Sequence, residues 1–149
     1  MPFKYIKNHA GKGRLLLMTF VVGIIMLFSC KKAIQQQQEN IIIDAVTAGR
    51  WYVELYTQNT TDITPGFAGY EFQFYKNGNV DGIKGTDTKT GTWSTDINNY
   101  TITAAFSGNA NDTLKLLNHT WKITDSYLNY VEAKTTTANG DNILHLRQK

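Results

Sequence analysis

The chain has 149 residues, with 15 basic and 12 acidic side chains and a single cysteine, which excludes a scaffold held by internal disulfides. Four of the bases and none of the acids lie within residues 1–29, so 11 bases and 12 acids follow that segment. A basic surface for nucleic acid is therefore not expected after residue 29. The 120 residues from position 30 onward are enough for one small domain and too few for two.

The segment 1–29 has the pattern of an export signal. Residues 15–28 form an apolar run of 14, preceded only by positive charges. A membrane-spanning helix needs about 20 apolar residues, whereas the apolar part of a secretory signal is shorter. Leu27-Phe28-Ser29-Cys30 resembles the bacterial lipobox, which implies cleavage before Cys30 and acylation of its thiol. An uncleaved inner-membrane anchor is the alternative.

Residues 30–48 are expected to form a lipidated tether. The glutamine run at 35–38 is polar and uncharged, which is typical of a flexible linker. The stretch ENIIIDAVTAG at 39–49 predicts a short helix that closes one end of the domain. Lys31 and Lys32 stand where surface-export signals of related bacteria carry acidic residues, which favours the periplasmic side. We expect the anchor in the outer membrane, facing the periplasm.

From Arg50 onward, apolar and polar residues alternate with a period of two, as in strands with one buried and one solvated face. Asn77-Gly78 and Asp125-Ser126 are expected to form tight turns, and 114–117 either a short strand or a connector. These signals predict an all-β fold, a small antiparallel up-and-down barrel, with a sandwich as the alternative. Closure is favoured because an open meander leaves two unpaired edges. The expected strands are 50–56, 69–75, 79–83, 89–94, 100–106, 121–124, 127–133 and 142–147.

The order of landmarks over residues 49–149 resembles the lipocalin-like lipoproteins of Bacteroidetes. The resemblance implies a lipocalin-like barrel domain at 49–149. It also implies that Arg147, from the last strand, packs over Trp51 of the Gly49-Arg50-Trp51 opening, whereas alternation places Arg147 on the outer face. The matching pieces are GRWYVELY at 49–56, DITPGFAGYEFQFYKNGNV at 62–80, GTWS at 91–94, NHTWKITD at 118–125 and NILHLRQK at 142–149.

Residues with catalytic potential are sparse. Only His119 and His145 follow the signal, at a strand junction and on an outward position. The chain contains no Gly-x-Ser-x-Gly, no His-Glu-x-x-His and no phosphate-binding glycine loop. We therefore expect no catalytic site, no metal site and no cofactor.

A binding function is better supported, because the predicted inner face is rich in aromatic residues. Several tyrosine hydroxyls among them would supply the few polar atoms that ligand pockets carry. The same residues would equally fill a small barrel as its core. The loop 58–69 is long for a hairpin connection and is expected to fold over a barrel mouth as a lid. The candidate ligand-binding residues are Phe72, Phe74, Trp93, Tyr100, Trp121 and Tyr130 on strands, and Ile63 and Phe67 in the loop.

Two functions remain open at this point. The first is a lipid-anchored envelope protein that holds a small apolar ligand inside the barrel. The second is a non-enzymatic accessory or inhibitor protein that binds a protein partner through outward Tyr52, Tyr56 and Tyr75. An interior cavity above about 300 Å³ would favour the first.

Overall fold

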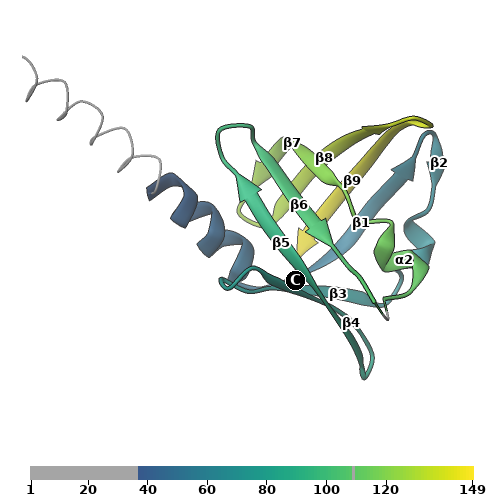
Figure 1. The fold of residues 1–149 in the computed structure, drawn as a ribbon, viewed down its shortest axis with the longest axis horizontal. Helices are drawn as coiled ribbons and strands as arrows, with labels where there is room; N and C mark the ends of the chain where they lie inside the picture. The colour runs from purple at the N-terminus through teal and green to yellow at the C-terminus, as the bar shows by residue number, and fades with distance from the viewer. Residues whose placement is uncertain (1–36, 109) are drawn as a thin grey trace, which may run out of the picture. The chain divides into compact units, whose positions relative to one another are not determined.

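The computed structural model describes residues 37–108 and 110–149 (Figure 1). Residues 37–47 are helical, and none of the helices in this part of the chain is long and apolar enough to cross a membrane. The predicted signal peptide and Cys30 lie outside the described residues. The elements that follow are β1 (Arg50–Gln58), β2 (Thr61–Asp62), η1 (Thr64–Phe67), β3 (Tyr70–Phe74), β4 (Asn79–Lys84), β5 (Asp87–Asp96), β6 (Thr101–Ala105), α2 (Asp112–Lys115), β7 (Thr120–Tyr127), β8 (Tyr130–Thr137) and β9 (Gly140–Gln148).

Eight of these strands close into an antiparallel barrel. The sheet runs β1-β3-β4-β5-β6-β7-β8-β9, and β9 pairs back onto β1 from Trp51↔Gln148 to Gln58↔Asn142. The two-residue β2 pairs only with the last two residues of β1. The predicted all-β up-and-down barrel is confirmed, and the sandwich alternative is wrong. Closure leaves no long free strand edge among these eight strands.

The barrel has two ends that are built differently. One end, here the helix end, carries the helix at 37–47 and the turns at 75–78, 97–100 and 128–129. The other, here the loop end, carries η1, α2 and the turns at 85–86 and 138–139. Figure 1 shows the helix on one side of the barrel and α2 on the opposite side.

A β-bulge in β1 changes which tyrosine is buried. The register with β9 shifts between Val53 and Leu55, so that one extra residue enters β1. Trp51 and Val53 point inward as expected, but after the bulge the inward residue is Tyr56, which is fully buried. Its predicted outward position is therefore wrong, and the proposed outer patch of tyrosines loses its middle member. Burial raises the pKa of Tyr56 to about 12, and the nearby Asn142 amide opposes this to a smaller extent.

Two further sequence expectations on local structure are corrected. The turn predicted at Asp125-Ser126 is absent, because β7 continues to Tyr127 after a bulge between Ile123 and Asp125. The segment 114–117, left open between strand and connector, belongs to α2 and the turn that follows it. Asn111 caps this helix, its side-chain oxygen accepting a hydrogen bond from the Leu114 amide at 3.0 Å.

The loop end is tightly packed. The Tyr56 ring stacks on Phe67 at 5.4 Å between centroids and meets Trp121 edge-on at 5.6 Å. Its hydroxyl donates to the Leu116 carbonyl at 2.8 Å, and Leu114 of α2 is fully buried. Because η1 and α2 insert buried side chains here, this end of the barrel is closed by its own core.

Candidate ligand-binding interior

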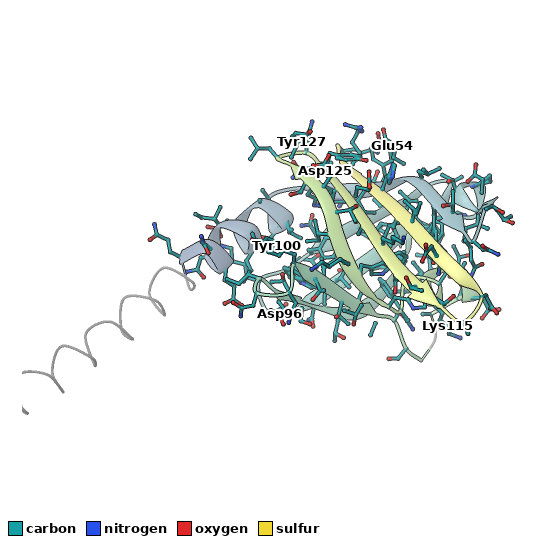
Figure 2. The ribbon with its side chains drawn as sticks, turned by 90° about the horizontal axis from the view of Figure 1, so that it is seen from above. Glu54, Asp96, Tyr100, Lys115, Asp125 and Tyr127 are labelled. Carbon is teal, nitrogen blue, oxygen red and sulfur yellow. The ribbon has the colours of Figure 1, made fainter. Side chains whose placement is uncertain are left out.

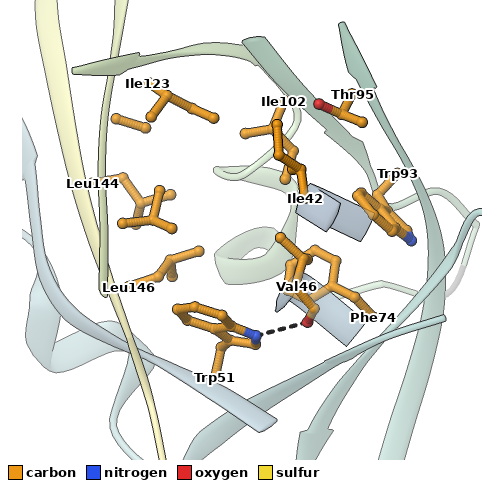
Figure 3. A pocket seen from close by; sticks show the side chains of 12 residues that line it. Ile42, Val46, Trp51, Phe74, Trp93, Thr95, Ile102, Ile123, Leu144 and Leu146 are labelled. Carbon is orange, nitrogen blue, oxygen red and sulfur yellow. Dashed lines mark hydrogen bonds between the residues drawn. The ribbon is translucent and has the colours of Figure 1, made fainter. Parts of the chain in front are cut away.

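The interior beneath the helix contains a small apolar cavity (Figure 3). Ile42 and Val46 of the helix form its roof, and the Trp51 indole N–H donates to the Val46 carbonyl at 2.8 Å. Its volume is about 40 Å³. The walls come from every face of the barrel: Trp51, Phe74, Trp93, Thr95, Ile102, Ile123, Val131, Ala133, Leu144 and Leu146.

A second cavity of about 40 Å³ lies deeper in the barrel. It shares Phe74, Ile102, Leu144 and Leu146 with the first cavity, so the two follow one another along the interior. Phe72, Phe106 and Trp121 are among its other walls. The few polar side-chain groups among the lining residues all donate to backbone carbonyls: the Thr95 hydroxyl and the indole N–H groups of Trp51, Trp93 and Trp121. A molecule bound here would have to be apolar.

Each cavity is well below the roughly 300 Å³ at which small-molecule pockets begin. As the interior stands, its own side chains fill most of it, which is the expected state of a small eight-stranded barrel. A ligand larger than a few heavy atoms would need the roof to move.

Four of the eight candidate residues are placed at these cavities. Phe72, Phe74, Trp93 and Trp121 are buried and line one or both of them. Their inward positions follow from the alternation in β3, β5 and β7, where no shift in register occurs before them.

Tyr100 and Tyr130 are not part of the interior, so their predicted inward positions are wrong. Tyr100 is 65% exposed, has a positive φ of 50° and ends the turn before β6. Val131 and Ala133 of β8 line the cavity, so Tyr130, which alternates with them, points outward. Its ring packs against the His145 ring at 5.6 Å and the Arg147 guanidinium at 5.0 Å.

The lid expected from loop 58–69 lies at the wrong end. Phe67 is buried and Ile63 half-buried against the core, but neither lines the two cavities. The helix at 37–47 covers the cavity instead. Ile42 and Val46 are spaced four residues apart, a helical spacing in the sequence that predicts one apolar face. The helix expected at 39–49 to close one end of the domain is therefore confirmed, with its bounds at 37–47.

Arg147 does not cover Trp51, so the contact implied by the lipocalin resemblance is wrong and the outward position given by alternation is confirmed. Its guanidinium donates to both carboxylate oxygens of Glu54, at 2.6 and 2.9 Å, on the outer face. This bidentate pair holds the pKa of Glu54 below its ordinary value. The indole of Trp51 is fixed by the helix instead.

The two histidines after residue 30 have structural neighbours. His119 meets the Trp121 ring edge-on at 5.5 Å, and His145 lies 3.6 Å from the Glu132 carboxylate. Within residues 37–108 and 110–149, no group of three or more histidine, cysteine, aspartate or glutamate side chains could hold a metal ion.

Asn142 is the one polar residue buried in the core of the described chain. Its amide lies near the Tyr56 hydroxyl, but neither amide atom forms a hydrogen bond of normal geometry there. Replacing it by leucine, which is similar in size, is expected to raise the free energy of unfolding by about 1 kcal/mol, because an unpaired buried amide costs about 1–3 kcal/mol. Urea denaturation followed by circular dichroism measures the change.

Asn118→Leu is the comparison for this prediction, because the Asn118 amide is paired although its side chain is exposed. The Asn118 amide pairs with both backbone groups of Phe106, at 2.6 and 2.7 Å, so its loss is expected to cost about 1–3 kcal/mol. If Asn142→Leu destabilises the chain as much as Asn118→Leu does, the Asn142 amide has a partner in solution.

The sequence matches no family model and no curated protein. The fold is similar to the crystal structure of a DUF4847 family protein from Bacteroides vulgatus ATCC 8482, with a TM-score of 0.51 and 14% sequence identity. The match covers 72% of this chain and 97% of that one. At this identity the similarity shows the fold alone, and it fits a lipocalin-like barrel.

Proposed function

We propose that the protein is a non-enzymatic, lipid-anchored protein of the cell envelope that binds a small apolar ligand in the barrel, under the helix at 37–47. The observation that carries this proposal is the pair of apolar cavities with a helix as their roof. The proposed anchor is a lipid on Cys30 in the outer membrane, and Lys31 and Lys32 after it favour the periplasmic side over the cell surface.

The helix is the element that has to move for a ligand to enter. Its polar contacts with the barrel are few: Val46 with Trp51, Thr47 with Gln73 at 3.4 Å, and an exposed Asp44–Lys76 ion pair. Exposed pairs of this kind contribute at most about 1 kcal/mol. The loop end is held by fully buried side chains, so opening costs less at the helix end.

Filling the upper cavity tests the proposal. Ala133 is buried and lines it, so Ala133→Leu places three more carbon atoms where a ligand would lie. Residues 31–149 are incubated with a total lipid extract of the source organism and measured by native mass spectrometry. We expect a ligand adduct with the unchanged sequence and at least a tenfold loss of it with Ala133→Leu, or about 1.4 kcal/mol.

Ala105→Leu is the matched control, because Ala105 is exposed on β6 and faces out of the barrel. It should leave the adduct unchanged, and circular dichroism should show both variants folded. If the unchanged sequence carries no adduct, the interior is only a core. Binding of a protein partner through the outer face would then be the remaining function, and cross-linking would test it.

A further inference from the structure

The exposed large hydrophobic side chains gather at the helix end of the barrel. Among the described residues there are five of them, and the loop end has none. Leu128 is 86% exposed and Tyr127 69%, at the tip of the β7–β8 hairpin. We call this set the hydrophobic rim: Ile41, Tyr75, Tyr100, Tyr127 and Leu128.

The rim follows from the topology of the barrel. Three hairpin turns lie at the helix end, and they carry Tyr75, Tyr100 and the Tyr127-Leu128 pair. Ile41 lies on the helix itself. Figure 2 shows Tyr100 and Tyr127 toward the helix and Lys115 at the opposite end. Between the helix and the β5–β6 turn, Ile41, Ile97 and Tyr100 line an open groove of about 300 Å³.

The chemistry of the rim suits a membrane interface. Tyrosine places an apolar ring and a polar hydroxyl side by side, which is why it collects at the headgroup level of bilayers. A leucine as exposed as Leu128 gains apolar burial only if another surface covers it. Two lysines lie next to the tyrosines: Lys122 is 5.6 Å from the Tyr100 ring centroid, and Lys76, beside Tyr75, is 67% exposed and paired with the Asp44 carboxylate.

The length of the chain before the helix limits which end can face a bilayer. Six residues lie between Cys30 and residue 37, so the two positions are at most about 25 Å apart when the chain is fully extended. A lipid on Cys30 therefore keeps the helix close to the membrane surface. The helix contacts Trp51, Gln73 and Lys76, so the helix end is the part of the barrel nearest to the lipid.

We propose that the hydrophobic rim docks on the phospholipid surface, with Leu128 inserted and the tyrosines at the headgroups. This rests on the proposed anchor at Cys30 and adds the face of the barrel that meets the bilayer. The groove beside Ile41 shares Ile42 with the upper cavity, so an apolar molecule leaving the bilayer would meet the roof of that cavity first.

The test compares the two ends of the full, lipidated chain in phosphatidylcholine vesicles. Leu128→Cys and Ala138→Cys place a single labelling site at a helix-end turn and a loop-end turn, and each is labelled with a fluorescent dye while Cys30 carries its lipid. We expect vesicle binding to reduce iodide quenching several-fold at position 128 and not at 138. Tyr100→Cys should follow position 128.

The other outcomes overturn the proposal in distinguishable ways. Equal quenching at both ends of protein that floats with the vesicles would refute the docking and leave the anchor intact. Protein that does not float with the vesicles would refute both. Protection at position 128 without vesicles, with a doubled molecular mass, would show that the rim instead pairs with a second copy of the chain.

Discussion

Trp121→Ala is expected to lower the free energy of unfolding by about 3–5 kcal/mol, the usual cost of removing a buried aromatic side chain. The indole is 2% exposed, lies edge-on to Tyr56 and forms a wall of the deeper cavity. Its N–H donates to the Leu117 carbonyl at 3.1 Å, which ties the α2 segment to the barrel. Alanine would add the lost volume to the existing cavity and remove one of the two donors to that carbonyl, which would keep only the His119 amide at 2.7 Å.

Chemical denaturation followed by far-ultraviolet circular dichroism measures this loss. Tyr100→Ala is the matched control, because the sequence places both residues on the inner face and the structure places only Trp121 there. We expect less than about 0.5 kcal/mol for Tyr100→Ala. Equal losses in the two variants would mean that the Tyr100 side chain is buried in solution, contrary to its exposed position in the structure.

The strands and their closure could be predicted from the sequence, whereas the orientation of several tyrosines could not. Tyr70, Phe72 and Phe74 alternate through an undisturbed strand, and all three are buried. A bulge before Tyr56 reverses its phase, and bulges depend on the partner strand rather than on the local pattern.

The predicted inward position of Tyr100 is wrong for a related reason. The Asp96 carboxylate accepts hydrogen bonds from the Asn98 and Asn99 amides, at 3.0 and 3.2 Å, and so prolongs the turn up to Tyr100. Tyr100 has a positive φ and precedes β6, so the alternation of that strand does not determine where its side chain points.

The site was predicted in part. Four aromatic walls were identified correctly because strand alternation places them, and a helix that closes one end of the barrel was expected from residues 39–49. The lid over the ligand, however, was assigned to the loop 58–69 on its length alone. Loop length does not say which end of a barrel a segment closes. That depends on where the loop joins the strands, and the connection from β1 to β3 lies at the loop end. Ile42 and Val46 belong to the helix that precedes β1, so strand alternation does not place them.

Ile42→Asp is expected to release the helix at 37–47 from the barrel mouth. Ile42 lines the upper cavity, so the substitution sets a carboxylate against an apolar wall, which costs at least the roughly 1–3 kcal/mol of an unpaired neutral polar group. The released state should therefore become roughly 5–150 times more populated. Uptake of the neutral apolar dye N-phenyl-1-naphthylamine, followed by stopped-flow fluorescence, should accelerate by a similar factor.

Ile41→Asp is the control, because it makes the same chemical change at a residue that is 62% exposed. It should leave dye uptake in solution unchanged. A second readout reports the roof directly. The Trp51 indole N–H is held by the Val46 carbonyl, so its hydrogen exchange should accelerate in Ile42→Asp and not in Ile41→Asp. Faster exchange without faster dye uptake would mean that the helix moves but does not gate the interior. Unchanged exchange in both variants would mean that the helix is held by more than its apolar face.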